Sequence, residues 1–139
     1  MPGYSTTPLS KKLGIRESAL VVLFGAPAAF RSALDPLPPG ARVLDDLPEK
    51  ERFDVAIVFA PTQRAFEKGF LAAKKRMKHD AGIWASWPKK ASKIVTDINE
   101  ASVREFGLAS GLVDTKVCAI DATWSGLRFV VRVSDRASF

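Results

Sequence analysis

The run Phe53–Ala60 (F-D-V-A-I-V-F-A) most strongly limits what this chain can fold into. It is almost continuously apolar and rich in β-branched residues, and it is too short to cross a membrane as a helix. Such a strand is typical of a parallel sheet whose two faces are both covered. Because parallel strands require crossover connections, which are usually helices, the run predicts an α/β fold.

Similar runs alternate with amphipathic segments along the rest of the chain. Strands are predicted at residues 19–26, 41–46, 53–60, 83–87, 113–120 and 127–133. Helices are predicted at residues 27–34, 62–79 and 99–111, after an N-terminal arm with a short helical turn at residues 1–15. This alternation predicts a three-layer, Rossmann-like, mostly parallel sheet with a C-terminal antiparallel hairpin that turns near residues 124–126. With 139 residues, 47% of them hydrophobic, one domain (1–139) with a flexible tail at 134–139 is expected.

Cap residues mark the ends of the predicted helices. Pro8 suits a first helical turn, and Thr62 and Asn99 have side chains that can cap helix N-termini. Gly14 and Gly111 suit the left-handed residue that follows a helix.

Positive charge is concentrated in one part of the chain. The net charge is +6, and nine Lys or Arg residues against two acidic residues lie between Arg64 and Lys93, whereas the rest is nearly neutral. Along the helix at 62–79, apolar residues repeat at helical spacing and face the sheet: Phe66, Phe70, Ala73 and Met77. Leu71 and four basic residues fall on the other face: Arg64, Lys68, Lys75 and Lys78. This basic face suits nucleic acid or another polyanion, and the alternative is a solvated helix surface.

Cysteine usage and the N-terminal region indicate a cytoplasmic protein that does not insert into a membrane. Cys118 is the only cysteine, so the sequence allows neither an intrachain disulfide nor a Cys/His zinc site, and no metal ligand set is expected. The apolar run Ala19–Phe30 follows basic residues and imitates a secretory signal. Glu17 beside the run and its β-rich composition favour a buried strand instead.

Three long motifs resemble one family of small bacterial proteins, domain of unknown function 3052. They are G-Y-S-T-T-P-L-S-K-K-L-G-I at Gly3–Ile15, W-P-K-K-A-S at Trp87–Ser92, and V-K-V-C-A-I-D-A-T-W-S-G-L between Thr115 and Arg128. The resemblance covers nearly the whole chain and implies no established activity.

A second resemblance is to the class I methyltransferases that use S-adenosylmethionine. F-D-V-A-I-V-F-A-P and M-K-H-D-A-G-I-W-A-S-W-P are similar to the fourth and fifth strands of that fold, and Asp45 or Asp46 matches the family's acid for the ribose hydroxyls. The family's Gly-x-Gly loop after the first strand is replaced by L-F-G-A-P-A-A-F, in which Gly25 is the one glycine and Pro27 removes a backbone donor. The resemblance therefore implies S-adenosylmethionine as cofactor, whereas the altered loop argues against its binding.

Three predicted strands end before a proline, at Pro27, Pro61 and Pro88, on the carboxyl edge of the sheet where ligands of such folds bind. The prolines could shape the rim of a cleft or simply terminate strands. The candidate ligand-binding residues at this edge are Gly25, Asp45, Asp46, Thr62, Lys89, Lys90, Ser92, Asp121 and Trp124.

The loop after Pro88 is the main candidate for binding an anion. Lys89 and Lys90 can donate to phosphate or carboxylate oxygens. The alternatives are a solvated loop, or ion pairs of these lysines with Asp97 or Asp121. Asp97 could also act as a general base, although no histidine lies near it in the sequence.

Aromatic residues and the remaining reactive side chains have mainly structural interpretations. Trp124 could stack on a base or cover the cleft, but packing against the N-terminal arm, for instance on Tyr4, is favoured. Trp84 and Trp87 are expected in the core, His79 at a helix end and Cys118 as a buried strand residue.

No catalytic triad, paired catalytic carboxylates, metal cluster or P-loop can be found in the sequence, so no catalytic residue is predicted. This favours a non-catalytic binding or regulatory module with a degenerate methyltransferase-like fold, which takes an anionic small molecule or protein partner at Lys89 and Lys90. One alternative is a methyltransferase with an atypical cofactor loop. Another is a nucleic-acid-binding protein that uses the basic helix at 62–79.

Overall fold

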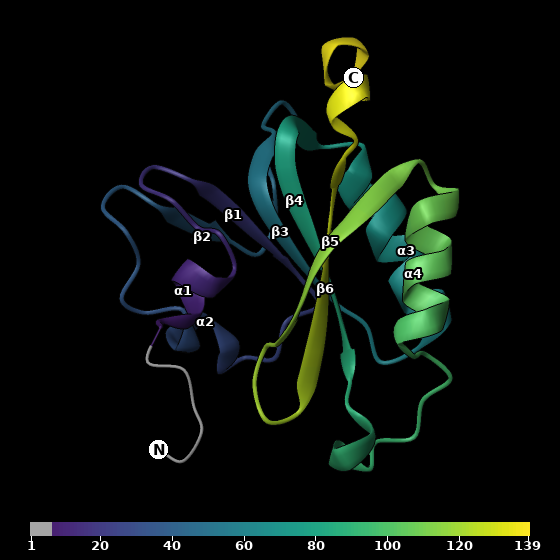
Figure 1. Cartoon of the computed structure of the whole chain (residues 1–139). Coiled ribbons are helices and arrows are strands. Elements are labelled where there is room, and N and C mark those ends of the chain that lie inside the picture. Colours follow the sequence, from purple (N-terminus) through teal and green to yellow (C-terminus); the bar gives the residue numbers. More distant parts are fainter. Residues whose placement is uncertain (1–6) are drawn as a thin grey trace.

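A computed structural model describes residues 7–139, which form a six-stranded sheet with helices on both faces (Figure 1). The strands are β1 (Leu20–Phe24), β2 (Arg42–Leu44), β3 (Phe53–Phe59), β4 (Met77–Pro88), β5 (Leu112–Ala119) and β6 (Trp124–Val131). The α-helices are α1 (Leu9–Lys12), α2 (Phe30–Ala33), α3 (Gln63–Lys74) and α4 (Glu100–Ala109). Two 3-10 helices are η1 (Lys90–Ser92) and η2 (Val133–Ser138). The predicted α/β class and the C-terminal hairpin are confirmed.

The strand order is β2-β1-β3-β4-β6-β5. Strands β1 to β4 are parallel, and β6 is antiparallel to both β4 and β5. The second strand of the hairpin therefore lies inside the sheet, and β5 forms the edge. The chain leaves β1 toward β2 on one side and then returns to β3 on the other side. Between β1 and β3 the strand order reverses, and ligands of open α/β sheets bind at the carboxyl ends of the strands at such a reversal.

Each face of the sheet has its own apolar core. On one face α3 and α4 contribute Phe66, Phe70 and Val103, which pack with Phe129 of β6. The short helices α1 and α2 lie on the other face (Figure 1), where the Trp84 indole donates to the carbonyl of Leu13 over 3.0 Å. Trp84 and Trp87 are both buried, as predicted. The fold thus has the three layers that the alternation predicts.

The predicted helix at 62–79 is too long, because β4 begins at Met77. Helix α3 ends at Lys74, the chain reverses through Arg76, and Met77 pairs with Phe53 at the start of β3. Met77 is buried as expected, but as a strand residue, and Lys78 and His79 also belong to β4. Pairing with β3 and the burial of Met77 override a sequence pattern that continues the helix. The segment that resembles the fifth methyltransferase strand, M-K-H-D-A-G-I-W-A-S-W-P, is β4 in full.

The hairpin turn was predicted too late in the chain. Trp124–Gly126 belong to β6, and the turn lies at residues 120–123. One carboxylate oxygen of Asp121 accepts the backbone N–H groups of Thr123 and Trp124, both over 2.8 Å. Asp121 therefore closes the turn itself, as short polar side chains often do.

The predicted caps agree with the structure. The Thr62 hydroxyl accepts from the Ala65 N–H over 3.2 Å, and Asn99 forms a reciprocal capping box with Ser102. Gly14 and Gly111 have φ values of +79° and +97°.

Three further features of the fold concern its C-terminal segment, the cysteine of β5 and the length of its helices. A flexible tail was expected at 134–139; Val133–Ser138 form η2, and Arg136 donates to the Val131 carbonyl. Cys118 is half-buried rather than buried, and desolvation raises the pKa of its thiol although Lys116 and Lys12 oppose the shift. Within residues 7–139 no helix is long and apolar enough to cross a membrane.

Candidate functional site

Gly25 follows the last residue of β1, at the reversal of strand order between β1 and β3. Its φ of +67° is left-handed, and a Cβ at this position would lie 3.0 Å from the carbonyl oxygen of Phe59. Only glycine allows both the left-handed backbone and this close approach of the two strand ends. Gly25 was a candidate from the sequence because it has no side chain, and the Phe59 carbonyl is the neighbour that requires this.

An aromatic row supports the same edge of the sheet. The rings of Phe30 and Phe59 meet edge to face with centroids 4.7 Å apart, and Phe59 meets Trp124 in the same way at 5.2 Å. Trp124 therefore packs against the end of β3 and is half-buried. Tyr4, the expected partner of Trp124, lies outside the described residues. Gly25 and Trp124 are thus brought together around Phe59.

The two aspartates that follow β2 have different surroundings. The carboxylate of Asp45 accepts from Arg31 over 2.9 Å, and the same guanidinium donates to the Val43 carbonyl over 2.5 Å. Within the described chain Asp46 has no hydrogen-bond or ionic partner and is exposed. Of the two acids, Asp46 is the one whose oxygens are available to a ligand.

The loop after β4 lines an open cavity of about 730 Å³. Lys89, Lys90 and Lys93 line it from one side, and Thr96, Asp97 and Asn99 line it from the part of the loop that leads into α4. Ser125, next to Trp124, belongs to the same lining. Figure 1 shows this loop and the β5–β6 turn at the same end of the sheet, with the C-terminus at the opposite end.

Neither aspartate that was considered for pairing with the lysines forms such a pair among the described residues. Asp97 accepts from the backbone N–H of Gln63 over 2.8 Å, and Asp121 shapes the hairpin turn. The Lys89 backbone N–H donates to the Thr123 carbonyl over 2.8 Å, so the loop is attached to the hairpin through the main chain. The ammonium groups of Lys89 and Lys90 are not needed to hold it.

Several predicted polar groups are already used inside the protein. The Ser92 hydroxyl donates to the Lys89 carbonyl over 2.6 Å, and the Thr62 hydroxyl caps α3. Thr96 donates to the Pro61 carbonyl over 2.5 Å, and Asp97 satisfies a further N–H at the start of α3. These contacts fix the loop against α3, and within residues 7–139 the ammonium groups of Lys89, Lys90 and Lys93 have no hydrogen-bond or ionic partner.

The basic residues of the predicted helix do not form one helix face. Arg64 and Lys68 lie exposed on α3 and Lys75 follows its last turn. Lys78 lies in β4, where its ammonium group pairs with Asp54 over 2.9 Å. The prediction of a basic helix face with four residues is therefore wrong for Lys78, which is a strand residue.

Ser86 was not identified as a site residue from the sequence. It lies in β4, is 1% exposed, and its hydroxyl has no hydrogen-bond partner within the described part of the chain. In the sequence, Ser86 is a hydroxyl residue in the apolar stretch between Trp84 and Pro88. A small serine in the core would give the same pattern. Only the three-dimensional structure, which shows a buried hydroxyl without a partner, distinguishes a candidate site residue from an ordinary small core residue.

Comparisons with known proteins identify the fold. No protein-family model matches the chain, and no curated protein sequence matches it. The solved structure of precorrin-6y C5,15-methyltransferase from Geobacter metallireducens matches with a TM-score of 0.63 and 11% identity, over 95% of this chain and 92% of that one. This chain has the methyltransferase fold. An S-adenosylmethionine-dependent methyltransferase from Aquifex aeolicus matches with a TM-score of 0.58 and 15% identity, over 88% of this chain and 87% of that one.

The methyltransferase fold also occurs with its cofactor in a further match. Magnesium protoporphyrin IX methyltransferase from Synechocystis PCC 6803, solved with bound S-adenosylmethionine, has a TM-score of 0.59 and 12% identity over 89% of this chain and 74% of that one. Identities this low show the methyltransferase fold alone.

Proposed function

We propose that this protein is an S-adenosylmethionine-dependent methyltransferase with an atypical cofactor loop. The observation that carries the proposal is the reversal of strand order between β1 and β3, where Gly25 brings a bare backbone to the carboxyl end of the neighbouring strand. Ligands of open α/β sheets bind at such reversals of strand order. The non-catalytic function favoured by the sequence has less support, because the neighbouring folds are methyltransferases along nearly the whole chain.

The residues at this reversal of strand order supply some of the groups that would hold the methyl donor. Gly25 leaves the space that a Cβ would fill, and Asp46 can accept hydrogen bonds from ribose hydroxyls. Asp45 keeps the end of β2 in place through Arg31. When bound, the sulfonium group of S-adenosylmethionine would supply an activated methyl group, and the protein's part is to hold and orient donor and acceptor.

In this proposal the methyl acceptor binds in the cavity that Lys89 and Lys90 line. Its volume of about 730 Å³ is in the range of small-molecule sites. The three lysines of its lining favour an acceptor with phosphate or carboxylate groups. Asp97 is held by the N-terminus of α3, so its carboxylate is a positioning group for α3 and the loop in this proposal.

Binding of S-adenosylhomocysteine, the demethylated product, tests the function without knowledge of the acceptor. Titration calorimetry of the full chain should give saturable binding, and a concentration of about 100 times Kd should stabilise the fold by about 2.7 kcal/mol. The variant Asp46→Asn should weaken the binding of S-adenosylhomocysteine. Asp45→Asn should weaken it less, because the Asp45 carboxylate is already paired with Arg31. Absence of both heat and a Tm shift at millimolar ligand would refute the methyltransferase function.

The second candidate is a binding module that takes an anionic small molecule or protein partner without the methyl donor. It is favoured by the loop after β1, because Pro27 removes one backbone donor and α2 is only four residues long. Citrate is a suitable probe, since its carboxylates match the lysines. The double variant Lys89→Ala/Lys90→Ala should lose the rise in Tm caused by citrate, whereas Lys68→Ala/Lys75→Ala should keep it. A large loss of Tm in the first variant without citrate would instead indicate that the lysines brace the loop.

We also infer, from the three motifs alone, that the chain is related to domain of unknown function 3052. Two of these motifs supply the loop that carries Lys89 and Lys90 and the hairpin turn that carries Asp121 and Trp124. The hydrogen bond from the Lys89 N–H to the Thr123 carbonyl makes these two motifs neighbours at the proposed acceptor cavity.

A further inference from the structure

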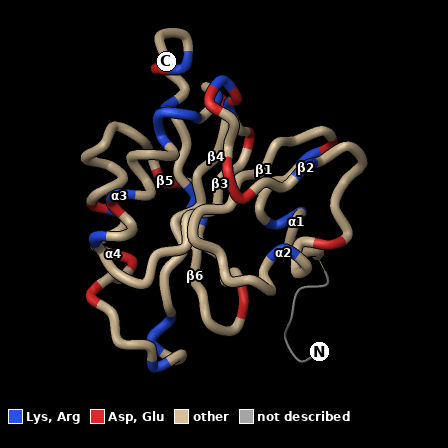
Figure 2. The backbone as a smooth tube through the Cα atoms, turned by 180° about the vertical axis from the view of Figure 1, so that it is seen from behind, with Lys and Arg blue, Asp and Glu red and all other residues tan. Residues whose placement is uncertain are grey.

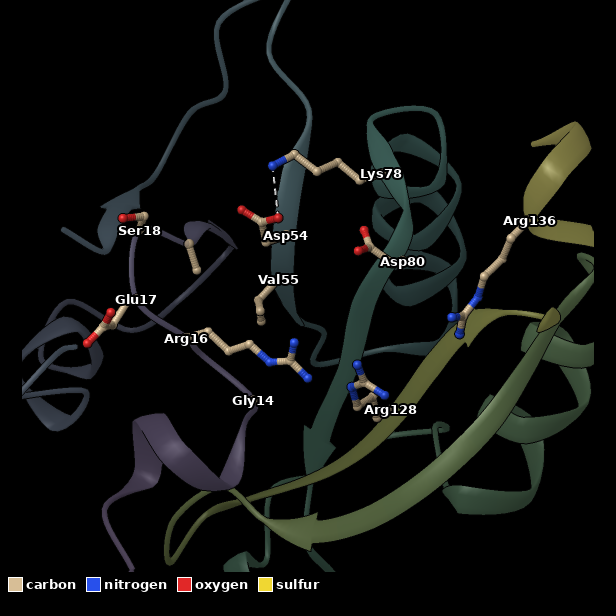
Figure 3. A pocket seen from close by; sticks show the side chains of 11 residues that line it. Gly14, Arg16, Glu17, Ser18, Asp54, Val55, Lys78, Asp80, Arg128 and Arg136 are labelled. Atoms are coloured by element: carbon tan, nitrogen blue, oxygen red, sulfur yellow. Dashed lines mark hydrogen bonds and ion pairs between the residues drawn. The ribbon is translucent and has the colours of Figure 1, made fainter. Parts of the chain in front are cut away.

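A second cavity lies at the opposite, amino-terminal edge of the parallel strands. Its volume is about 530 Å³. It lies between the segment that precedes β1, the first residues of β3 and β4, and the end of β6 with η2 (Figure 3). Three arginines from three different parts of the chain line it: Arg16, Arg128 and Arg136.

Arg128 is built into the wall of this cavity. A Cβ at Gly82 would lie only 2.6 Å from the Arg128 Nε atom, so the bare backbone of Gly82 makes room for the guanidinium against β4. The side chain is half-buried, and its hydrogen bond to the Thr115 hydroxyl is long, at 3.4 Å. Arg128 is therefore held in place by packing, while much of its donor capacity remains free.

Like charges surround this guanidinium. Burial lowers the pKa of Arg128, and the neighbouring charges of Arg136 and Arg16 lower it further. In Figure 3 the Arg16 and Arg136 side chains extend toward Arg128 from opposite sides of the cavity. Among residues 7–139, no carboxylate lies within ion-pair distance of any of these three arginines. Three guanidinium groups that converge without a counter-ion are a costly arrangement unless an anion binds between them.

The acidic residues of the cavity do not fill that role. Asp54 is already satisfied, since it accepts from Lys78 over 2.9 Å and from the Leu20 N–H over 2.8 Å. The Glu17 carboxylate points away from the guanidinium groups in Figure 3. Asp80 lies on β4 between the Asp54–Lys78 pair and Arg128, where its oxygens can accept from a hydroxyl group of a ligand.

We propose that this cavity binds the phosphate group of a small phosphorylated molecule, with Arg16, Arg128 and Arg136 as the phosphate ligands. Planar guanidinium groups bind phosphate oxygens in pairs, which suits the convergence of three of them. The cavity is much larger than one phosphate group and lies in the size range of small-molecule sites, so it has room for the rest of such a molecule. Because the arginines lie at the amino-terminal edge, this site is separate from the one proposed for the methyl donor.

Inorganic pyrophosphate is the probe for this site. In the wild-type chain it should raise Tm in a saturable way, by about 3–5 °C at ten times Kd, beyond the effect of sodium chloride at equal ionic strength. The variant Arg128→Gln should lose this shift and weaken binding in calorimetry at least tenfold. Its Tm without pyrophosphate should stay equal to that of the wild type or rise, because a partly buried charge among like charges is removed.

Controls separate a built site from general attraction to a basic protein. Arg64→Gln removes an exposed arginine of α3 and should keep the full pyrophosphate shift. Arg136→Gln leaves the wall at Gly82 untouched and should also weaken binding, which keeps the test valid even if Arg128→Gln does not fold. Equal shifts in the wild type and in both cavity variants, or no shift in the wild type, would overturn the proposal. Binding of S-adenosylhomocysteine should be the same in Arg128→Gln and the wild type, so the two proposals fail or succeed independently.

Discussion

At the scale of single residues, two glycines with left-handed backbones differ in one respect that matters for the site. Gly14 has nothing within 4 Å of where its Cβ would be, whereas at Gly25 the Phe59 carbonyl lies at 3.0 Å. Gly14→Ala should cost about 1 kcal/mol, from the backbone conformation alone. Gly25→Ala should cost about 2 kcal/mol or more, because the strand ends must also separate.

Urea unfolding of the two glycine variants measures this difference, and binding of S-adenosylhomocysteine gives a second comparison. Only Gly25→Ala should weaken binding if the methyl donor binds at the carboxyl ends of β1 and β3. Equal stability losses in the two variants would show that a Cβ at residue 25 does not clash with the Phe59 carbonyl.

Two serines that are buried in the described part of the chain provide a further prediction at this scale. The Ser10 hydroxyl donates to the Pro36 carbonyl over 3.1 Å, whereas the Ser86 hydroxyl has no partner within residues 7–139. Ser10→Ala should therefore lower the free energy of unfolding by about 1 kcal/mol, and Ser86→Ala should raise it by about the same amount. Thermal or urea unfolding of both variants decides this, and a loss of stability in Ser86→Ala would reveal a partner for its hydroxyl.

At the scale of elements, two helices pack on the sheet through glycines that meet different neighbours. A Cβ at Gly107 of α4 would overlap the ring of Phe129, whereas a Cβ at Gly69 of α3 would meet a methyl group of Val58 at 2.8 Å. The aromatic ring is fully buried and packs edge to face on Phe70, with centroids 5.2 Å apart, so it has no space into which it can move.

Gly107→Ala should therefore destabilise the protein by about 1–3 kcal/mol, as overpacking of a core does. Gly69→Ala should cost less, because alanine has a helix propensity about 1 kcal/mol better than glycine and a valine methyl can rotate away. Chemical unfolding of the two variants checks the order of their stabilities. If Gly69→Ala were the more damaging change, α3 and not α4 would be the more closely packed helix.

At the scale of the whole molecule, positive charge is less localised than the sequence indicates. Figure 2 shows Lys and Arg interspersed with Asp and Glu over the backbone, and Lys78, expected on the basic helix, is neutralised by Asp54. With Arg64, Lys68 and Lys75 as the remaining exposed basic residues of the α3 region, any binding of a polyanion should be weak and sensitive to salt.

Elution from heparin tests this expectation. Lys68→Ala/Lys75→Ala should elute at a lower salt concentration than the wild type, and a salt-dependence slope measured on RNA should fall by no more than about 2. Lys78→Ala should change elution less than the double variant does, since it removes one positive charge instead of two. Unchanged elution of the double variant would exclude α3 as the polyanion surface.

The amino-acid sequence by itself determined the elements whose signals are local. The continuous apolar run of β3, the caps at Thr62 and Asn99 and the alternation of strands and helices are encoded within a few residues, so the fold class was predictable. The candidate residues at the carboxyl edge could be chosen because parallel strands end together. Their partners could not, since Asp45 is held by Arg31 and Asp97 by α3 through contacts between distant segments.

Tertiary structure alone decided where β4 begins and which charges meet. Met77 belongs to β4 and not to a helix because pairing with Phe53 buries it. The stabilisation comes from β3, a strand that begins more than twenty residues earlier in the chain, so the sequence around Met77 does not reveal it. Arg16, Arg128 and Arg136 are more than a hundred residues apart at their extremes and converge on one cavity because β6 lies inside the sheet next to β4. Electrostatic interaction depends on distance in space, so a cluster of this kind becomes visible only when the chain is folded.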